Sequence, residues 1–282
     1  MLKLAQWIMG GRFNALVAAA VLGVLPFVAW TSASVVALVA LRRSAADALW
    51  PMAGATLVAL TVHWNSGDIT QLGTLLTVFA GALVLANTRS LPRALLTVCL
   101  GAALYLAILM QWMPHRFDPL VDMFKPFFDQ IRKAEPEQFL NQIDPRRMVE
   151  EIMGLMTGLS ALVALLLARW LQAKLYNPGG FRTEFHQLRI PPAVTGVLML
   201  GLLASQWLDE AMVVAPLLML PLLLAGIALV HGLLGRTGNR NQLVLFYVML
   251  VVFAGPAFVV LIAAAITDSF LDFRNRIGTT RP

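Results

Sequence analysis

Long apolar runs alternate with short polar connectors along almost the whole chain. The runs cover residues 13–29, 31–43, 48–63, 70–87, 94–112, 148–173, 193–208, 211–234 and 242–267. Most of them approach the roughly 20 residues that a helix needs to cross about 30 Å of hydrocarbon at about 1.5 Å per residue. We therefore predict an all-α, polytopic transmembrane helix bundle with eight or nine membrane segments, built as one integral membrane domain over residues 1–282.

The first two apolar runs are short. Pro26 and a cluster of small polar residues at 31–34 divide residues 13–43 into two pieces. The pieces can be two tilted crossings or one broken, re-entrant hairpin. A cleaved signal peptide over residues 1–33 is a further alternative.

Tryptophan marks the ends of the apolar runs. Indole rings gather where hydrocarbon meets the lipid headgroups, because the ring is apolar and its N–H needs a partner. The seven tryptophans are Trp7, Trp30, Trp50, Trp64, Trp112, Trp170 and Trp207. They indicate the two faces of a bilayer.

Basic residues are distributed unequally between the connectors. Under the nine-segment interpretation one side holds Lys3, Arg12, Arg42, Arg43, Arg89, Arg93, Arg169, Lys174, Arg182, Arg189, Arg236 and Arg240. The short connectors of the other side, around Trp30, Asp68 and 209–210, hold none. The positive-inside rule then places the first side and the N-terminus in the cytoplasm, with the protein in a bacterial inner (cytoplasmic) membrane. Alternation places the C-terminal tail outside.

The connector at 113–147 differs from the others, and alternation places it on the outer face as an extracytoplasmic insertion. Its apolar residues recur at helical spacing and include Leu120, Val121, Phe124, Phe127, Phe128 and Ile131. This spacing predicts an amphipathic helix, with a second short helix near 135–142. Asp144 then caps a helix whose first residue is Pro145. The insertion can be a solvated connector or a lid over an outward-facing pocket.

Composition excludes several classes of protein. A chain that is 59% hydrophobic and 13% charged cannot cover its apolar side chains in one soluble core. Its net charge of +6 does not indicate nucleic-acid binding, because the basic residues lie in short connectors. Membrane lipid is the partner that this distribution predicts. The single cysteine, Cys99, lies inside an apolar run and is expected to be a packing residue.

The apolar runs carry almost no ionisable groups, which disfavours an ion-coupled carrier with a carboxylate in mid-membrane. The four histidines show no metal-ligand spacing, and no glycine-rich phosphate loop is present. We therefore expect no metal, no cofactor and no enzymatic activity. Ser160 and His231 faintly resemble the serine and histidine of rhomboid-type intramembrane proteases, but they lie at different depths.

Three prolines within the last apolar runs are candidates for helix breaks. Pro216, Pro221 and Pro256 each leave a carbonyl without its helical partner, and such breaks often line substrate sites in transporters. The alternative is that these prolines only kink their helices and bind nothing. Gly154 and Gly158 form a pair that lets another helix approach closely.

The most distinctive connector is NPGGFRTEFHQLRIPP at 177–192. Its Asn-Pro-Gly-Gly sequence ends a helix in a turn, and its Pro-Pro starts the next helix. Its aromatic and charged residues predict docking of lipid headgroups or of an acidic partner; the residues are Phe181, Arg182, Glu184, Phe185 and Arg189. An ordinary basic connector is the alternative.

With this connector, and with ALVAAAVLGVLP followed by VALVALRR near the N-terminus, the chain resembles the YybS-like family of predicted bacterial membrane proteins of unknown function. That family is distantly similar to the substrate-binding subunits of energy-coupling-factor transporters. The resemblance implies that Ala15 and Ala19 pack on a transmembrane coupling subunit. This chain departs from those subunits in its eight or nine segments, where they have six, and in its longer outer insertion.

Two functions follow as hypotheses. The first is transport-related binding of a small neutral or weakly polar substrate, energised by a separate partner. The alternative is a non-catalytic membrane scaffold that docks a cytoplasmic protein, for example in the cell envelope. A membrane enzyme of another type is a third.

Overall fold

The computed structural model of the protein is all-helical in the part that it describes, residues 1–134, 144–208, 212–237 and 240–273. This part contains thirteen α-helices and a short 3-10 helix, η1, and no strand. The predicted all-α class is thereby confirmed. The predicted helix at 135–142, the 209–210 connector and the C-terminal tail from 274 lie outside the described residues.

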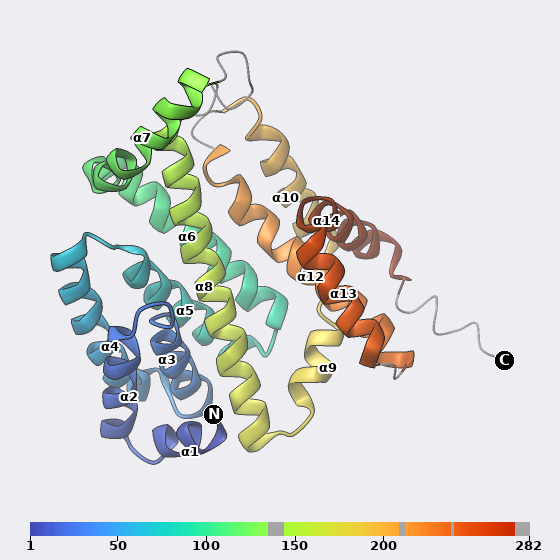
Figure 1. The fold of residues 1–282 in the computed structure, drawn as a ribbon. Coiled ribbons are helices and arrows are strands. Elements are labelled where there is room, and N and C mark those ends of the chain that lie inside the picture. The colour runs from blue at the N-terminus through green and yellow to red at the C-terminus, as the bar shows by residue number, and fades with distance from the viewer. Residues whose placement is uncertain (135–143, 209–211, 238–239, 274–282) are drawn as a thin grey trace.

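The helices follow one another with few intervening residues (Figure 1). They are α1 (Leu2–Met9), α2 (Arg12–Val24), α3 (Thr31–Arg42), α4 (Ala45–Ser66), α5 (Thr70–Thr88), α6 (Leu91–Trp112), η1 (Pro114–Arg116), α7 (Asp118–Ala134), α8 (Pro145–Tyr176), α9 (Gly180–His186), α10 (Pro192–Ala204), α12 (Ala215–Thr237), α13 (Arg240–Val252) and α14 (Ala254–Leu271).

Six helices are long and apolar enough to cross a membrane: α4, α5, α6, α8, α12 and α14. Many large apolar side chains are also exposed on the outside of the bundle, whereas soluble proteins rarely expose large contiguous apolar patches; Val197, Val251 and Val259 are 67%, 78% and 69% exposed. These features make the chain a multi-pass membrane protein. The apolar helices α2, α3, α10 and α13 are shorter, so the predicted count of eight or nine segments is not confirmed.

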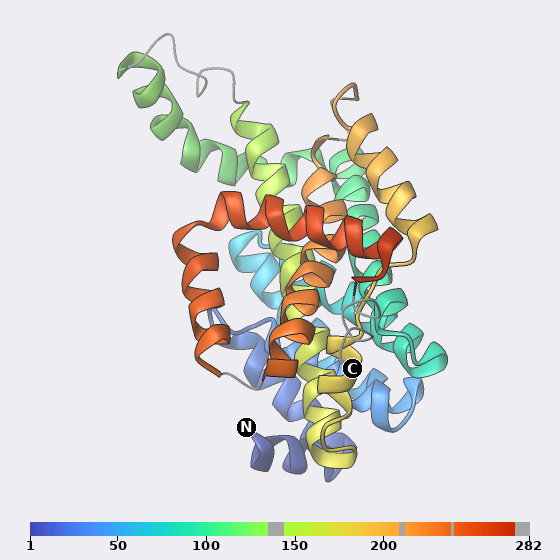
Figure 2. The same ribbon diagram turned by 90° about the vertical axis from the view of Figure 1, so that its right-hand side faces the viewer.

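The run at 242–267, which we expected to be one span, is two helices. α13 ends at Val252, and α14 begins after Phe253. Pro256 explains the break, because its ring would clash with the carbonyl of Val252, four residues earlier, and it has no N–H to donate there. Figure 2 shows the consequence: α13 runs along the bundle, whereas α14 crosses over α12.

α2 and α3 form a helical hairpin. Arg12 at the start of α2 pairs with Asp47 of α4 at 2.6 Å, and Arg43 at the end of α3 donates to the carbonyl oxygen of Met9 at 2.5 Å. The start of α2 and the end of α3 therefore lie close together. The turn that connects the other two ends carries Phe27, which is 96% exposed. Helices of 13 and 12 residues reach only about 20 and about 18 Å. These lengths favour the re-entrant hairpin over two full crossings.

α8 is the central helix and runs the full height of the molecule, with α1–α5 on one side and α10–α14 on the other (Figure 1). Gly154 and Gly158 of α8 face Leu217 of α12. A Cβ at Gly158 would lie 2.4 Å from the Cδ2 atom of Leu217. The packing role predicted for this glycine pair is therefore confirmed. A second small core joins α10, α12 and α14 around Leu198, Leu222 and Ala265.

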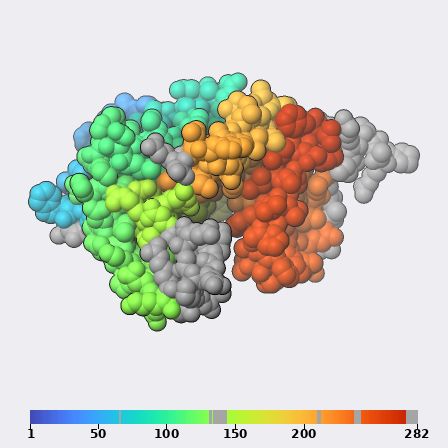
Figure 3. Space-filling view, turned by 90° about the horizontal axis from the view of Figure 1, so that it is seen from above, coloured from blue at the N-terminus to red at the C-terminus, as the bar shows by residue number. Residues whose placement is uncertain are grey.

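The two ends of the bundle carry different features. The end that bears η1 and α7, hereafter the α7 end, is seen from above in Figure 3, with α7 and the start of α8 on one side and α13 and α14 on the other. Two exposed tryptophans, Trp64 and Trp112, lie in the last turns of α4 and α6 at this end. The opposite end, hereafter the α9 end, carries the last turns of α8 and α9 itself (Figure 1).

The predicted amphipathic helix in the 113–147 insertion is present as α7, and Asp144 and Pro145 begin α8 as predicted. Arg146 fastens the two helices together. Its guanidinium donates to Asp118 Oδ1 at 2.9 Å, to the carbonyl oxygen of Pro114 at 2.6 Å and to Glu150 Oε1 at 3.2 Å. The hydrogen bond from Arg146, and then that from His115, lowers the pKa of Asp118 below its usual 3.8.

Because Arg146 and Asp118 join α8 to α7, we expect the packing of α7 on α8 to depend on pH. Because the folded-state pKa of Asp118 is lowered, its contribution is complete above 3.8 and is lost as the pH falls through the folded-state value. Hydrogen-exchange protection of α7 should therefore be constant above about pH 4 and decrease as the pH falls below 3.8. In Arg146→Ala the protection should already be low at about pH 5 and change little below it, whereas Lys125→Ala should behave as the wild type.

Candidate functional site

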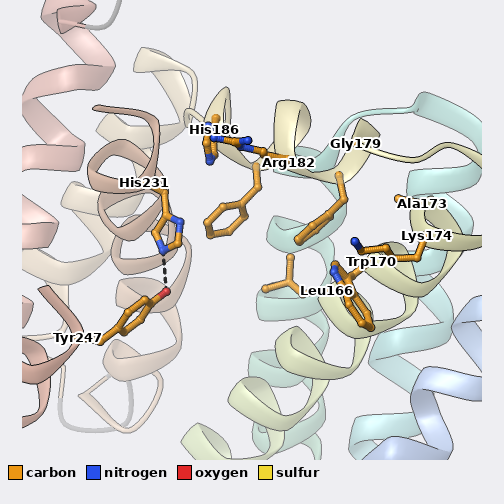
Figure 4. A pocket seen from close by; sticks show the side chains of 11 residues that line it. Leu166, Trp170, Ala173, Lys174, Gly179, Arg182, His186, His231 and Tyr247 are labelled. Carbon is orange, nitrogen blue, oxygen red and sulfur yellow. Dashed lines mark hydrogen bonds between the residues drawn. The ribbon is translucent and has the colours of Figure 1, made fainter. Parts of the chain in front are cut away.

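A pocket of about 490 Å³ opens at the α9 end, between α8, α9, α12 and α13. We call it the α9 pocket. It is lined by Leu166, Trp170, Ala173, Lys174, Gly179, Phe181, Arg182, Phe185, His186, His231 and Tyr247. Figure 4 shows Leu166, Trp170 and Lys174 of α8 on one side, His231 and Tyr247 on the other, and Arg182 and His186 of α9 above them. Its volume lies in the range of small-molecule sites, about 300–1,000 Å³.

The connector that was singled out in the sequence builds the upper wall of this pocket. α8 ends at Tyr176, and Gly179 adopts a positive φ of 89°, a backbone conformation that favours glycine. The chain thereby reverses and starts α9 at Gly180, and α10 begins at Pro192. The turn and the helix start that we predicted here are both confirmed.

Two ion pairs hold α9 and the following segment in place. Arg169, only 7% exposed on α8, donates through Nε to Glu184 Oε2 at 2.9 Å, and its Nη2 also binds Glu184 Oε1. Arg189 donates to the carbonyl oxygen of Ser269 at 2.7 Å and pairs with Asp272 at 3.0 Å. Two of the five residues predicted to dock a partner, Glu184 and Arg189, are therefore engaged in ion pairs inside the protein.

The far wall of the pocket is aromatic. His231 Nε2 and the hydroxyl of Tyr247 are hydrogen-bonded at 2.6 Å, as Figure 4 shows. The His231 ring also meets the Phe185 ring edge to face, with centroids 5.6 Å apart. The His186 ring lies 6.2 Å from the His231 ring and packs on Gly235, where a Cβ would approach His186 Cε1 to 2.6 Å. Gly235 thus lets α9 approach α12 closely enough to close the pocket.

Charge in the pocket is of one sign. Lys174 and Arg182 line it, and no carboxylate does. Neither cation makes an ion pair with the residues that the structure describes. Other arginines near this end do find partners: Arg12 binds Asp47, Arg43 binds the Met9 carbonyl, Arg42 stacks on Tyr176, Arg169 binds Glu184, and Arg189 binds Asp272.

The structure brings together part of the sequence-predicted site. Phe181, Arg182 and Phe185 line the α9 pocket, and the two phenyl rings stack with centroids 5.7 Å apart. The candidate prolines are absent from its lining. Pro216 is the second residue of α12, and Pro221 lies inside α12.

Three of the eleven lining residues were predicted from the sequence as members of a site. The others include four whose side chains matter for binding: Trp170, Lys174, His231 and Tyr247. Trp170 was assigned to the membrane interface and Lys174 to the basic connectors. His231 was considered only with Ser160. Tyr247 had no signal, because its position beside His231 depends on the fold of α13 back along α12.

A second, smaller cavity of about 260 Å³ lies between α1, α2, α3 and α8. Its walls are almost entirely apolar, with Thr31 and Ser34 as the only hydroxyl-bearing residues. The neighbouring Ala15 and Ala19 are 1% and 0% exposed. The small-residue face that the resemblance implied for a coupling subunit is therefore buried in the protein's own core, so such a subunit would need another surface.

Comparisons with protein-family models, with curated proteins and with solved structures found no match. Within the described part of the chain, no three His, Cys, Asp or Glu side chains gather as metal ligands would. The α9 pocket has the size and the mixed apolar and polar lining of a ligand site.

Proposed function

We propose that this protein is a transport-related binding protein of the membrane, which holds a small, largely apolar molecule in the α9 pocket and is energised by a separate partner. The observation that carries the proposal is the pocket itself. Its walls come from four helices, α8, α9, α12 and α13, and Leu166 of α8 lies far from Tyr247 of α13 in the chain. A ligand held there would touch both the α1–α8 part and the α12–α13 part, as substrates do between the moving parts of transporters.

The lining supports binding rather than catalysis. Aromatic and aliphatic side chains dominate it, with a few polar groups at its edge, as in ligand sites generally. His231 is hydrogen-bonded to Tyr247, and no serine or cysteine lines the pocket beside it. A nucleophile and a base, which a hydrolytic site needs together, are not paired there.

The second candidate is the membrane scaffold. It is favoured by the exposure of Arg182 of α9, which lies next to Phe181 and Phe185 at the open edge of the pocket. A cytoplasmic protein with an acidic segment would contact this helix. In that case the pocket would be filled by a side chain of the partner. The resemblance to the YybS-like family stays a prediction under either function.

We also propose that the α9 end faces the cytoplasm of a bacterial cell, in the inner membrane, with the N-terminus on the same side. The support is the gathering of basic residues at this end, where Arg12, Arg43, Lys174 and Arg182 lie outside the long apolar stretches. The short helices α2, α3 and α10 would then enter the membrane beside the six long ones.

A pocket-filling substitution tests the binding function. Leu166 is half-buried and lines the pocket, so Leu166→Trp should occupy part of it. Native mass spectrometry of wild-type protein extracted in mild detergent should show a retained small molecule. The Leu166→Trp variant should lack this molecule.

Val163→Trp is the matched control. Val163 lies one turn earlier on α8, is 39% exposed and does not line the pocket, so this variant should retain the molecule. A bare chain in all three preparations, or an acidic protein retained in place of a small molecule, would contradict the binding function; the protein would instead support the scaffold.

A further inference from the structure

We propose that the ligand of the α9 pocket is an anionic amphiphile, whose phosphate group binds Lys174 and Arg182 and whose apolar part lies against the aromatic wall. This inference rests on the proposed function, because it assigns a chemical class to the molecule held in the same pocket. It changes the neutral or weakly polar ligand that the charge-poor apolar runs led us to expect.

The first argument is charge. Lys174 in the last turn of α8 and Arg182 in α9 both line the pocket, and both are exposed. A cation that pairs with nothing in the protein is available to a ligand, and these two make no ion pair with the described residues. A phosphate accepts charge-assisted hydrogen bonds from both lysine and arginine. A neutral ligand would leave both charges without a counter-charge.

The second argument is how α9 is fixed. Glu184 is the acidic residue of α9, and it forms a bidentate ion pair with Arg169 of α8. Glu184 therefore does not neutralise Arg182, two residues earlier on the same helix. The Arg169–Glu184 pair both orients α9 and removes its negative charge from the pocket, which leaves the pocket positive.

The third argument is the apolar surface next to these cations. Trp170 lies one turn before Lys174 on α8, and Phe181 and Phe185 stack beside Arg182. A small inorganic anion would use none of this surface. An amphiphile would bury its first carbons against the rings, and burial of each CH₂ contributes about 0.8 kcal/mol. The pocket at the end of a membrane bundle, near Trp170, lies where lipid headgroups meet hydrocarbon.

A binding experiment with three probes tests this assignment. Full-length protein in a neutral detergent is titrated with dihexanoyl phosphatidic acid, dihexanoyl phosphatidylcholine or inorganic phosphate, and bound molecules are counted by native mass spectrometry. We expect phosphatidic acid to bind at least about tenfold more tightly than phosphatidylcholine, whose choline cation offsets the phosphate charge, since one charge-assisted hydrogen bond is worth about that factor. We expect a difference of at least about tenfold from inorganic phosphate as well, because inorganic phosphate has no CH₂ groups to bury against the rings. Added salt should weaken its binding.

Charge variants locate the site. Lys174→Gln and Arg182→Gln should each weaken phosphatidic acid binding by about tenfold. Arg93→Gln removes the same charge from an exposed position outside the pocket and should bind as the wild type does. Equal binding of phosphatidic acid and phosphatidylcholine would overturn the proposal. So would equal binding of inorganic phosphate, or an equal loss in all three variants.

Leu166→Trp separates the failure of this inference from the failure of the proposed function. If Leu166→Trp loses its retained molecule while both charge variants bind phosphatidic acid normally, the pocket binds a ligand but not through an anion, and this inference alone is wrong. If Leu166→Trp binds every probe as the wild type does and retains the same molecules, the pocket is not the binding site and both proposals are wrong.

Discussion

Replacing Glu184 by alanine is expected to lower the free energy of unfolding by about 3 kcal/mol, because it leaves a buried guanidinium without its counter-charge. Arg169 is 7% exposed, and both of its donors to Glu184 would lose their acceptors. The same contact holds α9 over the pocket. Glu184→Ala should therefore also reduce phosphatidic acid binding, even though Lys174 and Arg182 are unchanged. Thermal unfolding in detergent measures the first effect, and native mass spectrometry the second.

Two further variants make this prediction sharp. Glu151→Ala removes the partner of Arg147 from a half-exposed ion pair at 3.4 Å, and should cost less than about 1 kcal/mol. The double variant Arg169→Leu and Glu184→Leu replaces both charges together, so it should recover most of the stability that Glu184→Ala loses. If Glu184→Ala and Glu151→Ala cost the same, or if the double variant is less stable than Glu184→Ala, the Arg169–Glu184 pair is not the anchor of α9.

Much of the fold could be predicted because local chemistry decides it. Asp144 and Pro145 begin α8, the Asn177–Gly180 turn separates α8 from α9, and Pro192 starts α10, all as the sequence indicates. Each of these signals acts over a few residues, through a capping hydrogen bond, a positive φ or a missing N–H. Apolar length identified the long helices in the same way.

The division of the run at 242–267 into two helices could not be predicted from apolar length. The composition of this run is uniformly apolar, so length alone predicts one span. The structure ends α13 at Val252 and makes Pro256 the third residue of α14. A proline costs little in the first turn, where its N–H has no helical partner, but much in a helix interior. Pro221 lies inside α12 without ending it. The outcome at each proline depends on tertiary packing, which the local sequence does not contain.

The α9 pocket depends on the fold in a different way. Phe181, Arg182 and Phe185 could be selected from one connector, because they lie within five residues of one another. His231 and Tyr247 come from two later helices and meet only because α13 turns back along α12. Sequence periodicity indicates which face of a helix is apolar, but it does not say which other helix that face will meet.

The crossing of α12 and α14 gives the second large expected effect. Gly226 of α12 lies against the backbone of Leu261 in α14, and a Cβ there would stand 2.3 Å from the Leu261 carbonyl oxygen and 2.8 Å from its carbonyl carbon. A backbone group cannot rotate away as a side chain can. Gly226→Ala should therefore displace α14 and lower the free energy of unfolding by about 3 kcal/mol, measured by thermal unfolding.

The displacement should also be visible locally, because the end of α14 is tied to the start of α10. Thr195 and Ser269 share a hydrogen bond of 2.9 Å, and Ser269 Oγ donates to the Ile190 carbonyl oxygen at 2.8 Å. Hydrogen-exchange protection around both contacts should fall in Gly226→Ala. Gly196→Ala is the matched control: its Cβ would meet nothing within 4 Å, so it should be neutral or stabilise α10 by about 0.5–1 kcal/mol. Equal unfolding temperatures for the two variants would show that α14 does not pack on Gly226, since only a close backbone approach separates their expected effects.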